Sequence, residues 1–405
     1  MRVAFISESL PPAQTGQAVV LRRLLEGRGA SDYCLVSAAD WGGEGQSRNT
    51  LPGKTYALGG PFRFERGYRF GLARLRETLN VPLGVRQRAR QFAEIIGREA
   101  CDAVVACTGD VLDLPAACLA ARRAGVPFYA YLFDHYSYRE WRDPARRFWA
   151  RRFEPWVLRN AAAVIAPNEV LRDDLRARFG VEAAVIHNSF DISPYAGPDD
   201  GPHEAAGGVV YTGDIYEAHY DAFRNLLDAL DRLGRGGLKL HAYTPRTEGE
   251  LAEQGLRGRM VLHAPRDPSE IPGVQRGAGA LFLPLAFNSP YPELVRTSAT
   301  TKMGEYLAAR RPVIAHAPPD SFVAWYFREH ECGVVVDRLD PAQLAEAVAR
   351  VLDDEALGRR LARRGWERAA ADFDIGVARE KFWTLLGEGA RSARVAAGGA
   401  RVGGR

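Results

Sequence analysis

Thr300, Thr301, Lys302 and Glu305 are the residues of this chain whose types and spacing point most directly to chemistry. They lie in the segment TTKMGEYLAARRPVIA, where a polar turn leads into a predicted helix and then into a predicted buried strand. A helix N-terminus attracts anions, and a lysine beside it adds a mobile positive charge suited to a diphosphate. A carboxylate one turn into the helix is suited to accept two hydrogen bonds from a vicinal diol such as that of ribose. We therefore predict a nucleotide-type site at this turn.

A structural alternative for Glu305 is a capping box at the start of the same helix. With Thr301 as N-cap, the third helical position is Gly304, which has no side chain to complete the box. Only Lys302 as N-cap would place Glu305 at that position, and lysine is a poor cap. The spacing therefore favours a functional role for Glu305.

Short apolar strands alternate with amphipathic helices along the 405 residues, which predicts parallel sheets with both faces covered. The predicted strands of the first half are Val3–Ser7, Tyr33–Ser37, Ala103–Cys107, Phe128–Phe133, Ala163–Ala166 and Ala183–His187. Those of the second half are Gly208–Thr212, Leu238–Tyr243, Met260–His263, Ala280–Pro284, Pro312–His316 and Gly333–Val336. We expect an α/β fold of two doubly wound, Rossmann-like domains whose carboxyl edges face a shared cleft.

The domain boundaries follow from composition. Residues 191–207 are rich in Pro, Gly and Asp and have no periodicity, which predicts a linker between domains 1–190 and 208–375. A last helix, 376–388, can cross back onto the first domain. The Gly-, Ala- and Arg-rich residues 389–405 predict a disordered tail.

Several common classes of protein are disfavoured. The first strand is not followed by Gly-x-Gly-x-x-Gly, and the chain has no Walker A pattern, because Gly53-Lys54-Thr55 is preceded by Arg48 where that pattern has its first glycine. Both absences count against dehydrogenases and ATPases. Five scattered cysteines argue against a disulfide framework or a zinc knuckle. No apolar run reaches the length of a membrane span, and no signal peptide is evident, so we expect a soluble, cytoplasmic protein.

Seven segments, taken in order, resemble the GT-B glycosyltransferases of the retaining, family 4-like type, which use nucleotide-sugar donors. They are SLPPAQTGQAVVLRRLL (9–25), LFDHY (132–136), RNAAAVIAPNEVLRDDL (159–175), VIHNSFD (185–191), VVYTGDIYEAHYDAFRNLLDAL (209–230), HAPRDPSEIPGVQRGAGALFLPL (263–285) and KMGEYLAARRPVIA (302–315). The resemblance covers about residues 1–387, and its last segment is the most specific.

The resemblance implies transfer of a sugar from a nucleotide-diphosphate donor to a glycan, lipid-linked or small-molecule acceptor. It implies no cofactor and no metal, because helix N-termini and basic side chains stabilise the leaving diphosphate. For retaining enzymes of this type, front-face attack is the usual proposal, with the leaving phosphate helping to take the acceptor proton. The donor-binding residues would be Gly16, Gly213, Arg266, Thr300, Thr301, Lys302 and Glu305, and the catalytic residues Asp134, His135 and Glu305.

The chain departs from the family pattern at three positions. The family often has a glutamate where this chain has Thr297, and its donor domain usually has an arginine and a lysine near Asp214 and His219. The alternatives are therefore a catalytically silent GT-B subunit that binds sugar or membrane, and another GT-B enzyme such as a nucleotide-sugar epimerase.

Four polar residues at predicted strand ends allow two interpretations. Asp134 and His135 either contact sugar hydroxyls and assist proton transfer, or serve as a helix cap and a satisfied histidine. Asn168 either touches the donor or caps a helix, and His187 before the linker favours a structural role.

A basic aromatic segment, YREWRDPARRFWARRFEPWVLRN (138–160), also has two interpretations. Its Trp149, Phe153 and Trp156 share one helical face that can pack on the sheet. Alternatively the segment docks on an anionic membrane surface, supported by the Arg-rich stretch Phe62–Arg90 and by a net charge of +7 over residues 1–190. Peripheral attachment to the inner face of the membrane therefore stays open, whereas no nucleic-acid-binding module is found.

Overall fold

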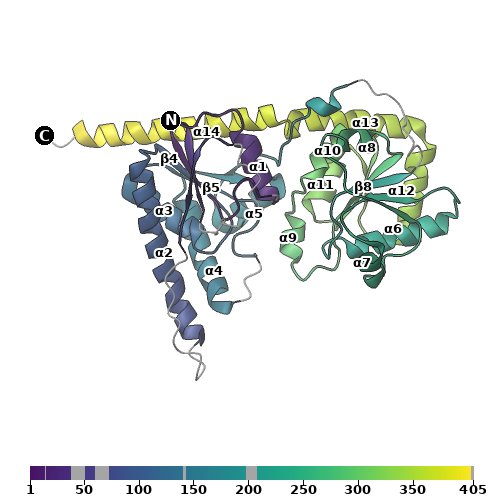
Figure 1. Ribbon diagram of the computed structural model, residues 1–405, viewed down its shortest axis with the longest axis horizontal. Helices are drawn as coiled ribbons and strands as arrows, with labels where there is room; N and C mark the ends of the chain where they lie inside the picture. Colours follow the sequence, from purple (N-terminus) through teal and green to yellow (C-terminus); the bar gives the residue numbers. More distant parts are fainter. Residues whose placement is uncertain (14, 38–50, 60–72, 140–142, 198–207, 403–405) are drawn as a thin grey trace. The chain divides into compact units, whose positions relative to one another are not determined.

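The computed structural model describes residues 1–13, 15–37, 51–59, 73–139, 143–197 and 208–402 (Figure 1). Its contacts divide the chain into two compact units, one of Met1–His187 with Ala378–Arg405 and the other of Asn188–Val377. Each unit contains one parallel sheet with helices between its strands, so the predicted α/β class is confirmed.

The sheet of the first unit has, among the described residues, seven parallel strands in the order β3-β2-β1-β4-β5-β6-β7. Most of these strands are short apolar runs that are buried along their whole length, as expected for a sheet covered on both faces. The edge strand β3 is different, because its residues are mostly exposed and it has no apolar run by which to predict it. The strands are β1 Val3–Ile6, β2 Tyr33–Ser37, β3 Lys54–Ala57, β4 Ala103–Cys107, β5 Phe128–Tyr131, β6 Ala163–Ala166 and β7 Ala183–Val185.

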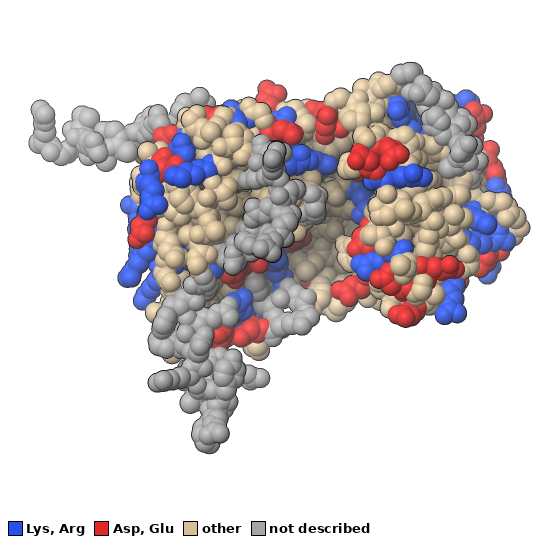
Figure 2. Space-filling view, viewed as in Figure 1, with Lys and Arg blue, Asp and Glu red and all other residues tan. Residues whose placement is uncertain are grey.

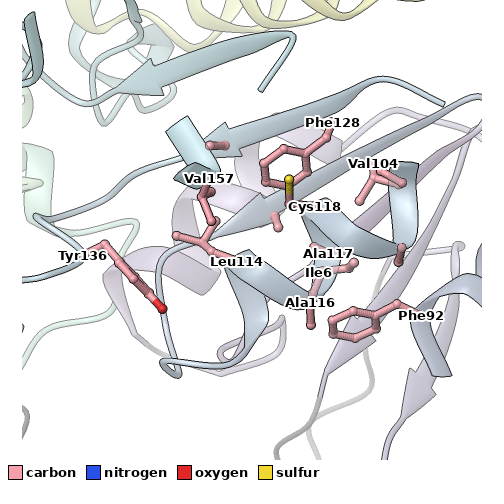
Figure 3. Packing of buried hydrophobic residues seen from close by; sticks show 14 of the residues in the cluster. Ile6, Phe92, Val104, Leu114, Ala116, Ala117, Cys118, Phe128, Tyr136 and Val157 are labelled. Atoms are coloured by element: carbon pink, nitrogen blue, oxygen red, sulfur yellow. The ribbon is translucent and has the colours of Figure 1, made fainter. Parts of the chain in front are cut away.

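The helices of the first unit enclose its hydrophobic core. Figure 3 shows Phe92, Leu114, Phe128 and Val157 packed together there, from α2, α3, β5 and α4. The long helix α2 contains Pro82 in its interior and is rich in arginine. Both features obscure its helical periodicity in the sequence. The helices are α1 Gly16–Leu25, α2 Ala73–Arg98, α3 Asp113–Ala124, α4 Pro144–Arg159 and α5 Glu169–Phe179.

The last helix, α14 (Ile375–Val402), begins in the second unit and packs on the first from Ala378 onward. Phe382 is fully buried and stacks on Phe5 of β1, with 6.0 Å between ring centroids. Arg379 donates to the carbonyl of Arg23 at 2.7 Å. The helix continues to Val402, whereas the sequence predicted disorder from residue 389. Alanine and arginine, which are frequent there, are strong helix formers.

The sheet of the second unit has, within the described residues, six parallel strands in the order β10-β9-β8-β11-β12-β13. They are β8 Val209–Thr212, β9 Leu240–Tyr243, β10 Met260–His263, β11 Ala280–Pro284, β12 Val313–His316 and β13 Val334–Val336. The order changes direction at β8 and β11, and the carboxyl edge at such a point is where open α/β sheets bind ligands.

The helices of the second unit lie mainly between these strands. The two short ones before β12, α9 and α10, matter most for the site. The helices are α6 Tyr220–Leu233, α7 Glu248–Glu253, α8 Ile271–Arg276, α9 Pro292–Arg296, α10 Lys302–Ala308, α11 Phe322–Glu329, α12 Pro341–Asp353 and α13 Glu355–Arg368, with a π-helical turn at Ala369–Phe373 and a 3₁₀ turn at Ser193–Tyr195.

The surface of the second unit mixes charges of both signs. Figure 2 shows acidic and basic side chains interspersed over the face of this unit that is in view. None of the helices that the structure describes has the length and apolar character needed to cross a bilayer.

Replacing Phe382 by alanine tests how much the last helix contributes to the first unit. We expect Phe382→Ala to lower the free energy of unfolding of that unit by about 3–5 kcal/mol, because it removes a fully buried ring. Urea denaturation followed by tryptophan fluorescence measures the change. Lys381→Ala, at an exposed position of the same helix, is the control. Equal stability of the two variants would contradict the packing described for α14.

Candidate active site

The centre of the candidate site is the Lys302 side chain, which crosses the end of β8 at Gly213. Gly213 has φ +125°, and a Cβ atom built on it would lie 2.3 Å from Lys302 Cε. Any other residue would therefore both strain the backbone and displace the lysine. The backbone N–H of Gly213 donates to the carbonyl of Tyr243 at 2.8 Å, so this glycine provides space for Lys302 and no free donor.

The Lys302 ammonium group lies in a partly buried position with a favourable aromatic contact. Its Nζ is 5.5 Å from the centre of the Tyr211 ring, within the range of a cation–π interaction. Burial lowers the pKa of Lys302, and the negative charges of Glu305 and Asp214 oppose that effect. Among the described residues the ammonium group donates no hydrogen bond, and it is therefore available to an anionic ligand.

The helix that carries Lys302 is held by a buried hydrogen bond to the sheet. The hydroxyl of Tyr306 accepts from the backbone N–H of Thr212 at 2.9 Å, at the last residue of β8. The chain of contacts continues from the Thr212 hydroxyl, which accepts from Gln275 Nε2 at 3.0 Å, to Tyr195, which donates to Gln275 Oε1 at 2.7 Å. The start of α10 is thus fixed against the end of the central strand.

Gly304 allows α10 to pack closely against its neighbours, near enough for Tyr306 to reach Thr212. A Cβ atom at this position would lie 2.9 Å from both Phe190 Cε1 and Phe373 Cβ. Phe190 and Phe373 also join the backbone, since the Phe190 N–H donates to the Phe373 carbonyl at 2.9 Å. The glycine therefore lets the helix lie directly on these two aromatic side chains.

The capping-box alternative for Glu305 does not match the structure. Thr301 is the N-cap of α10, its side chain makes no capping hydrogen bond, and the third helical position is Gly304. Thr300 provides a turn contact, because its carbonyl accepts from the N–H of Met303 at 3.2 Å. Glu305 is partly buried and lies three residues after Lys302, on the same face of the helix. Thr300, Thr301, Lys302 and Glu305 are thus gathered at the carboxyl edge of the sheet with Gly213.

Arg246 is a residue of this edge that the sequence analysis missed. Its Nε and Nη2 atoms donate to the two carboxylate oxygens of Asp214 at 2.6 and 2.8 Å. Arg246 follows β9 and Asp214 follows β8, and these strands are neighbours in the sheet. A guanidinium group therefore reaches the end of β8 from the next loop, although position 214 itself carries a carboxylate.

Arg266, in contrast, lies away from this pair. It is exposed after the edge strand β10, with its guanidinium carbon 6.0 Å from the ring of Tyr243. The strand order separates β10 from β8 by one strand. Its predicted contact with a diphosphate stays a prediction.

His219 is buried at the N-cap position of the 14-residue helix α6. Its Nδ1 atom has no hydrogen-bond partner among the described residues. Burial, reinforced by the positive charge of Lys302, lowers the pKa of His219 to about 3. The imidazole is therefore neutral at neutral pH.

Thr297 occupies the position at which the sequence analysis noted a missing glutamate. The side chain is fully buried, and its hydroxyl donates to the carbonyl of Glu293 at 3.1 Å. The hydroxyl thus closes the last turn of α9.

The first unit contains the remaining predicted site residues. His135 is fully buried, with Nε2 2.9 Å from Asp174 Oδ2 and Nδ1 3.2 Å from Arg178 Nη1. Because arginine can only donate, Nδ1 accepts and Nε2 carries the proton. The structure favours the interpretation of His135 as a satisfied histidine, although in the interior and not at the surface.

Asp134 is the more accessible residue of the pair. It is partly buried, and burial raises its pKa although the positive charge of Arg139 opposes the shift. Gly16 is the first residue of α1, and the space around its Cα is open. Thr15 caps this helix through its hydroxyl, which accepts from the N–H of Ala18 at 3.3 Å.

A buried charge cluster in the first unit also escaped the sequence analysis. Arg88 Nη1 lies 2.7 Å from Asp113 Oδ1 and 2.8 Å from Asp110 Oδ2. Burial raises the pKa of Asp113 to about 7, although Arg88 opposes the shift. Arg88 belongs to α2 and Asp113 is the first residue of α3, so their ion pair joins the two helices. The Asp113 carboxylate is buried in this pair and is not exposed to a ligand.

The polar residues near the end of the first half have structural contacts. Asn168 caps α5, accepting from the N–H of Leu171 at 2.8 Å. His187 Nε2 lies 3.2 Å from Glu169 Oε2. Asn188 donates to the carbonyl of Ala299 at 2.8 Å, and so supports the turn before Lys302. Among the described residues, no group of three His, Cys, Asp or Glu side chains is arranged to hold a metal ion.

Comparison with known proteins identifies the family of the chain. Residues 38–193 match the model of Glycosyltransferase Family 4, and residues 206–354 match the model of Glycosyl transferases group 1. The chain belongs to the GT-B glycosyltransferases. The structure of a glycosyltransferase from Rickettsia africae is similar to this one, with a TM-score of 0.67 at 12% identity over 96% of this chain and 98% of that one.

A second solved structure and a relative in sequence are also similar to this chain. Anabaena HepE, solved in complex with UDP and glucose, has a TM-score of 0.65 at 17% identity over 96% of this chain and 100% of that one. Glycogen synthase of Mycobacterium tuberculosis is 28% identical over 236 residues, which are 55% of this chain and 53% of the relative. The chain thus spans about half the length of the curated relatives it matches.

Enlarging Gly304 tests the close packing that positions Lys302. We expect Gly304→Ala to destabilise the second unit by about 1–3 kcal/mol, because the added methyl group overlaps Phe190 and Phe373. Thermal unfolding measures the loss. The matched control is Gly249→Ala in α7, where a Cβ atom meets nothing within 4 Å and no loss is expected. An unchanged melting temperature for Gly304→Ala would show that α10 does not rest on these rings.

Proposed function

We propose that this protein is a retaining glycosyltransferase that transfers a sugar from a nucleotide-diphosphate sugar to a glycan, lipid-linked or small-molecule acceptor. The observation that carries the proposal is the Lys302 ammonium group at the end of β8, partly buried and without a hydrogen-bond acceptor among the described residues. A charged group in such a position calls for an anionic ligand. A diphosphate satisfies it, and breaking a sugar–diphosphate bond increases the negative charge that Lys302 would stabilise.

Glu305 has the complementary role in this proposal. Its carboxylate accepts hydrogen bonds from a vicinal diol of the donor, while its negative charge opposes the lowering of the Lys302 pKa by burial. The sugar nucleotides bound in HepE, UDP-glucose among them, support a uridine nucleotide as the first donor to test. No metal or cofactor is required by this scheme, because protein groups supply the positive charge.

The first unit would bind the acceptor. Asp134, at the carboxyl end of β5, is the accessible group there that can contact acceptor hydroxyls, because His135 is already engaged. With front-face attack, the leaving phosphate takes the acceptor proton and the protein needs no dedicated base.

The site proposal is tested by titrating the protein with UDP-glucose in a calorimeter. We expect Lys302→Met to weaken binding about 10- to 100-fold, because it removes a charged contact to phosphate. We expect about a tenfold loss for Glu305→Gln, which keeps the shape but removes the charge. Lys239→Met, at an exposed position of the same unit, should bind like the wild type.

The outcome also separates the alternatives. Unchanged affinity in both folded site variants would contradict the site. Binding without transfer to any acceptor would favour the catalytically silent subunit, and isomerised donor among the products would favour an epimerase.

We propose further that α2 and α4 form a membrane-binding face, defined here by Leu79, Leu83 and Phe148 and the arginines around them. These three apolar side chains are 53%, 40% and 58% exposed. The two helices are joined next to them, because Trp149 Nε1 donates to the carbonyl of Thr78 at 2.8 Å. The aromatic stripe of the segment otherwise packs inward, since Trp149, Phe153 and Trp156 contact the core.

The charge of this face fits an anionic lipid surface. On the described parts of α2 and α4, the exposed acidic residue is Glu94. The exposed arginines are Arg86, Arg90, Arg98, Arg147, Arg151, Arg152 and Arg159. Apolar tips surrounded by arginine are typical of helices that lie at a lipid interface. Phe64, Tyr68 and Phe70 of the predicted second stretch lie outside the described residues.

Sedimentation with vesicles tests the membrane-binding face. Using phosphatidylcholine vesicles with about 30 mol% phosphatidylglycerol, we expect Arg147→Glu with Arg151→Glu to weaken binding about 30-fold or more, since each arginine contributes about 1 kcal/mol. Phe148→Ser should weaken it less. Arg359→Glu with Arg363→Glu on α13 makes the same charge change at exposed positions of the second unit and is the control. Equal partitioning of both double variants would contradict the proposal.

A further inference from the structure

His219 is a buried group that the roles assigned above do not use. It is 7% exposed, and its Nδ1 atom has no hydrogen-bond partner among the described residues. A buried polar atom without a partner is unfavourable, so native proteins keep one only where something else offsets the cost. The position of His219 at the N-cap of α6, where its side chain makes no capping bond, leaves the nitrogen open to a ligand.

The surroundings of His219 identify that ligand as an anion. Lys302 is close enough for its charge to affect the imidazole, and both groups contact the Tyr211 ring, whose centre is 6.2 Å from that of His219 and 5.5 Å from Lys302 Nζ. The Lys302 ammonium group and the Nδ1 atom of His219 both lack a hydrogen-bond partner among the described residues, and one phosphoryl group satisfies both once Nδ1 is protonated. The N-terminus of the long helix α6 adds to the same potential.

We infer that His219 is a second phosphate-binding group of the Lys302 site and that it takes up a proton when the diphosphate binds. The inference rests on the proposed function, which it deepens by assigning proton uptake to donor binding. The bound imidazolium donates from Nδ1 to a phosphoryl oxygen, and its positive charge adds to that of Lys302.

The charges around His219 determine how the affinity for the diphosphate changes with pH. In the free protein, burial and the charge of Lys302 hold its pKa at about 3, although Asp214 opposes them. Asp214 is itself paired with Arg246, and Glu305 faces Lys302 on α10. The rings of Tyr211 and Tyr216 also lie beside the imidazole, and burial raises the pKa of Tyr211 well above its ordinary value. A phosphate anion is therefore the group that can raise the pKa of His219, and affinity then increases as the pH falls.

Calorimetry with UDP-glucose, GDP-mannose and ADP-glucose as probes tests the inference. The phosphates of a sugar nucleotide carry one negative charge each and do not titrate between about pH 5 and 8, so any proton uptake comes from the protein. We expect the wild type to take up protons on binding, measured at about pH 6 in two buffers of different ionisation enthalpy. His219→Asn, which keeps a donor but does not titrate, should show no proton uptake and no gain of affinity in acid. His219→Gln provides a second variant in case the first does not fold.

The outcomes are distinguishable. Proton uptake that persists in His219→Asn or His219→Gln, or that is absent from the wild type, overturns the role of His219 while the proposed function stands. Failure of all three probes to bind the wild type overturns both. A purely structural role for His219 would change the melting temperature without changing the number of protons taken up.

Discussion

The path of the Lys302 side chain across the end of β8 is the constraint on which the rest of the second unit depends. An ammonium group held in a partly buried position is costly, so every neighbour must either make room for it or balance its charge. Gly213 makes room, Tyr211 presents its ring, and Glu305 and Asp214 supply negative charge. The helix α10 then has to be fixed in place, which the Tyr306 hydroxyl and the contact surface of Gly304 achieve.

This arrangement has a cost in stability. Lys302 Nζ and His219 Nδ1 have no hydrogen-bond partner among the described residues, whereas Thr212, Gln275 and Tyr195 are hydrogen-bonded to one another. A chain selected for stability alone would fill the same volume with apolar side chains. Conflicts between local satisfaction and the global fold are expected at functional sites, and one of them lies here at the end of β8.

Strands and helices could be predicted from the sequence where their apolar residues form a clear buried pattern, and not where that pattern is missing. Strands such as Ala280–Pro284 are buried throughout, so their apolar runs predict them directly. The edge strand β3 is exposed, and α2 contains Pro82, so neither has a clear pattern. The cluster of Thr300, Thr301, Lys302 and Glu305 was predictable because its members are neighbours in the chain. Arg246 was not, because its pairing with Asp214 depends on the order of β8 and β9 in the sheet, and nothing in one sequence specifies that order.

The last helix has a consequence for how the chain is made. Phe382 and Trp383 complete the packing around Phe5, which lies at the very start of the sequence. Nascent chains emerge from the ribosome in order, and domains generally fold as they emerge. Here the contacts of Phe5 with α14 form only after the whole of the second unit has been synthesised. The first unit thus begins to fold before the second and is completed after it, and a gene cut between the two halves would separate α14 from the sheet on which it packs.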